Sequence, residues 1–262
     1  MKSKVGAVAI IVSSVALLGA VLYFANANKP KPVDPNTGCT GRVTSKTVIL
    51  LDHSEDISDQ TKSEILSRVN KRISEEIKKN ELVSIYYVAE LSQKKLTPEF
   101  SRCKPMPPEE TNQLTQSEKL IRKTYQEQFL KPLQEVITRK IAGANQSPIA
   151  QALVDISLLS QLKDAEHSRL LIFSDMIENS KGKFSMYSQC GLPKQELITN
   201  YRTSVGTALA RPSFANLQVE LHLIPRENTR QQIVECRNFF WSWFFGDMTG
   251  DSKLIKFDLP GS

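Results

Sequence analysis

Two aspartates stand at the ends of short apolar runs that lie far apart in the chain. Asp52 follows Val48-Ile-Leu-Leu, and Asp175 follows Leu170-Leu-Ile-Phe-Ser. Such runs are typical of strands that are buried on both faces of a parallel sheet. Ligands of these sheets bind just beyond the carboxyl ends of the strands. We therefore expect the two carboxylates to face one crevice.

Two loops add further oxygen donors to this pair. Ser54 and Asp56 follow Asp52 closely, and Ser147 precedes a proline in a separate loop. Carboxylate and hydroxyl oxygens suit a hard divalent cation that keeps part of its water. The pattern predicts a metal site for Mg²⁺, with Mn²⁺ or Ca²⁺ as the other candidates.

This arrangement resembles the metal-ion-dependent adhesion site of von Willebrand factor A (vWA) domains. That site combines Asp-x-Ser-x-Ser after the first strand, a Thr from a second loop and an Asp after a later strand. Asp52 and Ser54 match the first two motif positions, and Asp175 matches the later aspartate. Asp56 stands where the family has its second Ser, and Ser147 takes the place of the Thr. The resemblance runs from about residue 47 to residue 262 and implies a metal that binds a carboxylate of a partner protein.

The same residues also have ordinary structural interpretations. A strand that ends in Asp can simply cap the next helix, and Ser147 followed by Pro148 is a common helix start. The metal site is favoured because all these candidate ligands occur together: several loops supply oxygen donors in the same order as in the family.

The periodicity of the chain predicts an α/β fold. Strands alternate with helices, which is typical of a Rossmann-like, doubly wound and mostly parallel sheet with helices on both faces. The predicted strands cover about 48–51, 82–89, 96–102, 170–174, 217–224 and 254–258, and the predicted helices about 60–79, 117–141, 148–162 and 229–245. We expect the helix over 117–141 to bend or restart at Pro132.

Residues 1–27 are predicted to hold a single transmembrane helix or an uncleaved signal. Residues 5–25 are apolar and uncharged, long enough to span hydrocarbon. Ala25-Asn26-Ala27 offers a cleavage site, but the apolar stretch is longer than that of a typical cleaved signal, which favours an anchor. The prolines of residues 28–45 predict a semi-extended linker, and residues 46–262 form the vWA-like domain.

The four cysteines fit an exported domain with disulfides, because none lies in the anchor and none forms Cys-x-x-Cys. Cys39, Cys103, Cys190 and Cys236 permit three pairings. We favour Cys103 with Cys190, which would join two long insertions, and free buried thiols are the alternative. The domain is therefore expected outside the cytoplasm, periplasmic or extracellular, on a single-pass protein of the inner or plasma membrane.

Charge and motifs narrow the class of function. The net charge is +6, but basic residues alternate with acidic ones, so no nucleic-acid partner is indicated. The chain lacks His-Glu-x-x-His, Gly-x-Ser-x-Gly and a phosphate-binding glycine loop, and no small-molecule substrate is identified. We expect a protein-interaction module of an envelope-associated assembly rather than an enzyme.

Two other functions stay open. One is a structural subunit of a secretion, conjugation or defence apparatus, with a vestigial metal site. The other is a metal-assisted hydrolase that uses Asp52, Asp56 and Asp175.

Two stretches are candidate partner contacts. The loop over 176–193 is either long enough to cover the site as a partner contact or a disordered or locally helical insertion. The aromatic run over 239–245 is either a partner surface or part of the core.

Overall fold

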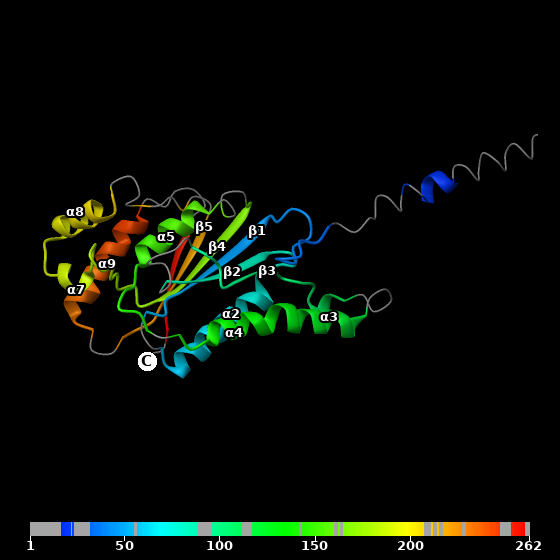
Figure 1. Ribbon diagram of the computed structural model, residues 1–262, viewed down its shortest axis with the longest axis horizontal. Coiled ribbons are helices and arrows are strands. Elements are labelled where there is room, and N and C mark those ends of the chain that lie inside the picture. Colours follow the sequence, from blue (N-terminus) through cyan, green and yellow to red (C-terminus); the bar gives the residue numbers. More distant parts are fainter. Residues whose placement is uncertain are drawn as a thin grey trace, which may run out of the picture.

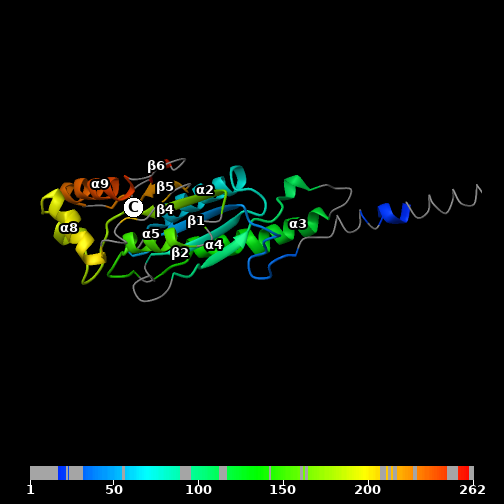
Figure 2. The same cartoon turned by 90° about the horizontal axis from the view of Figure 1, so that it is seen from above.

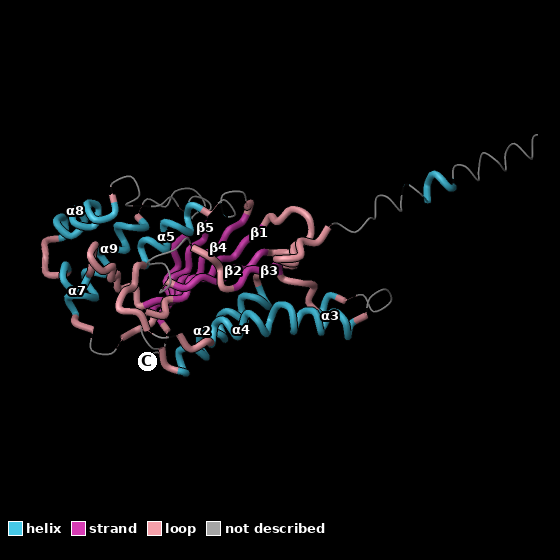
Figure 3. Tube along the Cα trace, viewed as in Figure 1, coloured by secondary structure: helices cyan, strands magenta, loops and turns pink. Residues whose placement is uncertain are grey.

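The structure is a computed structural model that describes residues 17–21, 23, 32–54, 57–88, 96–111, 117–141, 143–159, 162, 165–206, 211, 214, 217–226, 229–246 and 253–259. Within these residues the chain forms one sheet with helices on both faces (Figures 1 and 3). Its strands are β1 (Ser45–Leu51), β2 (Leu82–Tyr87), β3 (Phe100–Cys103), β4 (His167–Ser174), β5 (Leu217–Leu223) and β6 (Lys253–Asp258).

The strand order across the sheet is β3-β2-β1-β4-β5-β6. β3 runs antiparallel to β2, and the other neighbours are parallel. The predicted doubly wound, mostly parallel sheet is therefore confirmed. β1 and β4 lie at its centre, and Ile49, Leu50 and Leu171 have no exposed surface, as the apolar runs of both strands predict.

Two apolar clusters cover opposite faces of the sheet. On one face, α2 (Asp59–Glu75) and α4 (Lys131–Thr138) pack against Ile49 and Leu51. On the other face, α5 (Ile149–Leu158), α8 (Lys194–Val205) and α9 (Gln231–Phe245) pack against Val48 and Leu50. In both views α8 and α9 lie at the end of the domain away from α3 (Glu118–Thr124) (Figures 1 and 2).

Helix α2 shows how local sequence sets these elements. Its first turn is capped by Ser58, whose side chain accepts a hydrogen bond of 3.1 Å from the Thr61 backbone N–H. Ile65, Val69 and Ile73, spaced four residues apart, form its buried stripe. The predicted helix over 60–79 is thus confirmed, with an earlier end at Glu75.

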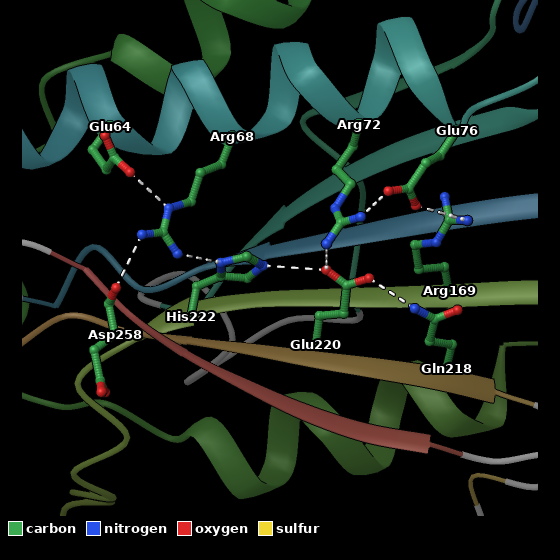
Figure 4. A network of polar contacts seen from close by, with 9 residues as sticks. All are labelled: Glu64, Arg68, Arg72, Glu76, Arg169, Gln218, Glu220, His222 and Asp258. Carbon is green, nitrogen blue, oxygen red and sulfur yellow. Dashed lines mark hydrogen bonds and ion pairs between the residues drawn. The ribbon is translucent and has the colours of Figure 1, made fainter.

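A polar network also ties α2 to β5 (Figure 4). Arg72 donates to the buried carboxylate of Glu220 at 2.8 Å, and Arg68 Nη1 lies 3.2 Å from His222 Nδ1. Burial alone would raise the pKa of Glu220, but contact with His222 and the charge of Arg72 outweigh it and hold that pKa below its usual value. The network joins α2 to β5, which carries the polar residues Glu220 and His222 on this face.

The helix predicted over 117–141 is interrupted by a π-helical stretch. The segment consists of α3, η2 (Tyr125–Leu130) and α4, and Pro132 lies in the first turn of α4. Pro132 has no backbone N–H to donate to the carbonyl four residues before it, so the wider turn forms directly ahead of it. The predicted irregularity at Pro132 is present as this wider turn.

The pairing of the cysteines differs from the prediction. Cys39 is bonded to Cys103 and Cys190 to Cys236, so the predicted pair of Cys103 with Cys190 is wrong. Residues 32–44 fold back onto β3, where the Cys103 N–H donates to Thr37 O at 2.8 Å, and this brings Cys39 to Cys103. Cys190 instead lies at the end of α7 (Met186–Gln189), beside α9.

The loop over 176–193 contains the short helix α7, in agreement with the alternative of a locally helical insertion. Helix α8, which follows it directly, was not predicted. The buried face of α8 consists of only Leu197, Ile198 and Tyr201, which is too sparse a pattern to stand out in the sequence.

Most of the predicted membrane segment over 5–25 lies outside the described residues. Among the residues that the structure does describe, no helix is both long enough and apolar enough to cross a bilayer.

Candidate functional site

The candidate site lies at the carboxyl edge of the sheet, the edge where the parallel strands end. β1 and β4 are neighbours, with Leu51 opposite Phe173, so the residues that follow them leave the sheet side by side. The Asp52 N–H donates to Phe173 O at 2.9 Å, which continues the pairing one residue beyond β1. This register places Asp52 next to Ser174 and Asp175, as the two apolar runs predict.

Asp52 is the centre of this site. Its Oδ1 accepts from the Ser54 N–H at 3.1 Å, and its Oδ2 accepts from the hydroxyls of Ser147 at 3.0 Å and Ser174 at 2.7 Å. Asp52 is only 1% exposed, and the three serines that bond to it are also buried. One carboxylate thus gathers groups from three segments of the chain.

Ser147 is held beside Asp52 by backbone pairing with residue 179. Residues 147 and 179 bond in both directions, from Ser147 N to Asn179 O at 2.8 Å and from Asn179 N to Ser147 O at 3.0 Å. The first turn of α5 is capped by another group, because Glu178 Oε2 accepts from the Ala150 N–H at 2.7 Å. The alternative that Ser147 caps this helix is therefore wrong, and its hydroxyl turns to Asp52.

Asp175 is held separately by arginines that the sequence analysis did not identify. Its Oδ1 accepts from the Ile177 N–H at 2.8 Å, and its Oδ2 accepts from Arg226 Nε at 3.0 Å. Arg237 Nη1 also donates to the Asp175 backbone carbonyl at 3.1 Å. Burial and the nearby charge of Asp52 raise the pKa of Asp175 to about 6, although Arg226 opposes this shift.

The turn after Asp175 has an unusual backbone that its neighbours hold in place. Met176 has a φ of 60°, a left-handed conformation that costs a non-glycine residue roughly 1 kcal/mol. Its N–H donates to the Ser174 hydroxyl at 2.8 Å, and its carbonyl accepts from Trp241 Nε1 at 2.6 Å. The aromatic run on α9 therefore supports the site directly.

The neighbouring titratable groups are both buried. Burial lowers the pKa of His53 to about 4, so its imidazole is neutral at neutral pH, and its ring packs edge-on against Tyr87. Burial raises the pKa of Glu178 to about 7, although hydrogen bonds from the Ala150 N–H and the Ser180 hydroxyl oppose this shift. Glu178 links the site loop to the start of α5.

The donor set fits a hard cation on one side of the site. The Ser147 hydroxyl donates its hydrogen bond to Asp52, so the lone pairs of its oxygen can still accept a hydrogen bond or bind a cation. Together with Ser54, these oxygens suit Mg²⁺, which keeps several waters, better than Ca²⁺, which takes six to eight ligands. Asp56, the third predicted ligand of the loop that begins at Asp52, lies outside the described residues. The described part of the chain contains no group of three or more His, Cys, Asp or Glu side chains placed to hold a metal.

The two stretches predicted to meet a partner differ in exposure. On α9, Phe240, Trp241, Phe244 and Phe245 are buried, so the aromatic run is mainly core. Lys194 lies over the half-buried Phe239 ring at 5.0 Å, and Arg202 and Arg211 lie over Trp243 at 5.3 and 5.1 Å. In the loop over 176–193, Tyr187 is 53% exposed.

Comparison with known proteins gives similarity at the level of the fold alone. No family model matches the sequence, and no curated protein matches it. Among solved structures, the chain is similar to the ArnB paralog VWA2 of Sulfolobus acidocaldarius, at 11% identity and a TM-score of 0.38 over 82% of this chain and 42% of that one. It is also similar to the SpRpn10 VWA domain, at 10% identity and a TM-score of 0.36 over 82% and 89% of the two chains.

A third similar structure is the PilB minor pilin of Streptococcus sanguinis. The identity is 11% and the TM-score 0.41, over 82% of this chain and 57% of that one. The chain thus spans about half the length of the VWA2 and PilB structures, at 42% and 57%.

Proposed function

We propose that this chain is a vWA-like protein-interaction module whose partner binds at the carboxyl edge of the sheet. The observation that carries the proposal is the carboxylate of Asp52. It is buried at this edge and gathers Ser54, Ser147 and Ser174 from three segments. A buried, convergent polar site where parallel strands end is the usual place for ligand recognition in an open α/β sheet.

The proposal includes a divalent cation, most simply Mg²⁺, held by Asp52, Ser54 and Ser147 with Asp56. Such a cation would supply an open coordination position for a carboxylate of the partner protein. The chain's own residues orient the site. Ser174 and the Ser54 N–H fix the Asp52 carboxylate, and the bonds of Ser147 to residue 179 hold its hydroxyl toward that carboxylate.

The direction of the sheet suits a domain that is tethered through its N-terminal segment. That segment enters the domain at the start of β1, and Asp52 follows the end of the same strand. The seven residues of β1 span about 20 Å at roughly 3.3 Å per residue, so the site lies across the sheet from the tether. With residues 5–25 as a membrane anchor, the carboxyl edge would face away from the bilayer.

Both disulfides suit the proposed location outside the cytoplasm, because such bonds persist in oxidising compartments. The role as a structural subunit of an envelope assembly remains a second candidate. It is favoured by the pairing of Arg226 with Asp175, which gives one of the site carboxylates a cation from the protein itself.

Site-specific photo-cross-linking in intact cells tests the proposal. A cross-linking residue at Tyr187, 53% exposed in the loop after Asp175, should give a protein adduct. The matched control is the same residue at Leu120, which is 63% exposed on α3 at the other end of the domain. The Tyr187 adduct should disappear in the Asp52→Asn variant. Equal adducts from both positions, or an adduct that is unchanged by Asp52→Asn, would overturn the proposed binding edge.

A further inference from the structure

The clearest departure from a simple cation site is the arginine that pairs with Asp175. Arg226 follows β5 by three residues, so it reaches the site from the strand next to β4. Its Nε lies 3.0 Å from Asp175 Oδ2, and the two side chains are only 11% and 4% exposed. A buried pair of this kind is held firmly, because breaking it would leave an uncompensated charge away from water.

The second oxygen of Asp175 is also occupied. The Ile177 N–H donates to Oδ1 at 2.8 Å, so both carboxylate oxygens of Asp175 already have a partner. Arg237 adds a second buried guanidinium at the Asp175 backbone carbonyl, 3.1 Å away. Asp52 has no arginine among its hydrogen-bond partners in the described residues, since its carboxylate is bonded to one N–H and two hydroxyls. Both oxygens of Asp52 are thus occupied as well, but by neutral donors, whereas Asp175 is paired with a buried cation. The arginine, and not the number of hydrogen bonds, distinguishes the two carboxylates.

We propose that Arg226 withdraws Asp175 from metal coordination and serves as its permanent counter-cation, so that Asp52 alone of this pair is left to bind a divalent cation. This inference rests on the cation site of the proposed function and names the residue that sets its affinity. Of the two carboxylates that the structure describes here, Asp175 is balanced by Arg226 and Asp52 is left without a cation of its own in the described residues. A divalent cation held by Asp52 then keeps a net positive charge toward a partner's carboxylate.

Removing Arg226 should accordingly tighten metal binding. In Arg226→Met the Asp175 carboxylate is released to the cation, and we expect the dissociation constant for Mg²⁺ to fall by about tenfold or more, equivalent to about 1.4 kcal/mol. The matched control is Arg230→Met, which removes the same charge from an exposed residue in the same segment. It should stay within about twofold of the wild type, because distant exposed charges are largely screened.

A double-mutant cycle separates this pairing from a general effect of charge. Asp175→Asn in the wild-type background should leave Mg²⁺ affinity almost unchanged, whereas Asp175→Asn added to Arg226→Met should abolish the gain. Arg226→Lys, which keeps the charge, should resemble the wild type. All variants are compared by isothermal titration of MgCl₂ into the full-length protein in detergent with its disulfides intact, and by melting temperature with and without Mg²⁺.

The outcomes are distinct. Tighter binding in Arg226→Met, even where the wild type shows none, supports the inference. If the wild type binds Mg²⁺ and Arg226→Met binds it equally or more weakly, the inference is overturned, but the proposed cation site is still supported. Should neither protein bind Mg²⁺ at millimolar concentration, both the cation site and the role of Arg226 fall. Where Arg226→Met does not fold, a loss of Mg²⁺ affinity in Asp175→Asn alone overturns the inference, and unchanged affinity supports it.

Discussion

Replacement of Asp52 should destabilise the whole domain, because this carboxylate organises three segments of the chain. In Asp52→Ala the Ser54 N–H and the hydroxyls of Ser147 and Ser174 lose their acceptor in a buried site. A buried donor left without a partner costs about 1 to 3 kcal/mol. Release of the repulsion between Asp52 and Asp175 offsets part of this loss. We expect the free energy of unfolding to fall by roughly 2 to 4 kcal/mol.

Asp52→Asn provides the matched comparison. The amide keeps the shape and one acceptor oxygen, and the two hydroxyls can turn to accept from its NH₂ group, so the cost should be about 1 kcal/mol. The measurement is urea unfolding followed by circular dichroism, at one pH and with disulfides intact. A free energy of unfolding for Asp52→Ala within about 0.5 kcal/mol of the wild-type value, as found for ordinary surface substitutions, would refute the claim that Asp52 holds the three segments together.

The same variant predicts a change at Asp175, because Asp52 is one of the causes that raise the Asp175 pKa to about 6. Without the neighbouring charge, the pKa of Asp175 should move down toward its ordinary value, which carboxyl-carbon NMR would detect. An unaltered pKa in Asp52→Asn would show that the two carboxylates do not interact.

Two further predictions concern stability. The pKa of Glu178 is raised from 4.5 to about 7, so its contribution to stability is present below pH 4.5 and is lost as pH rises through 7. Glu178→Gln should flatten the unfolding free energy across this range, and an unchanged pH profile would contradict the assignment. The second prediction is that mild reductant opens Cys190–Cys236 before Cys39–Cys103, because Cys39 and Cys103 are 6% and 4% exposed whereas the other two are half-buried. Alkylation and peptide mass mapping give the order, and reduction of the buried pair first would count against it.

The strands that carry the site could be predicted because their signal is local. The runs before Asp52 and Asp175 are apolar throughout, and only strands covered on both faces accept such runs. The alternation of strands and helices predicts that both strands belong to a mostly parallel sheet, whereas their position as neighbours depends on the strand order, which only the structure gives. Ser147 could be placed by its resemblance to the family's Thr, and the structure brings its hydroxyl to Asp52 at 3.0 Å.

The partners of Asp175 could not be predicted, because nothing in the local sequence distinguishes them. Arg226 lies 51 residues from Asp175 and Arg237 lies 62 residues away, and both are ordinary basic residues in a chain with many. Ser174 is the last residue of β4, and its sequence position gives no sign that its hydroxyl bonds to Asp52. The disulfide pairing failed for a similar reason, since it depends on the fold-back of residues 32–44 and on the packing of α7 against α9.

The most direct test of the account is whether the contact at the carboxyl edge needs a divalent cation. Photo-cross-linking from Tyr187 would be repeated on isolated membranes before chelation, after chelation, and after return of Mg²⁺. The account predicts that the adduct is lost on chelation and restored by Mg²⁺ in the wild type, and that Mg²⁺ does not restore it in Asp52→Asn. An adduct of unchanged yield after chelation would contradict the cation-dependent site and identify the domain as a metal-free structural subunit.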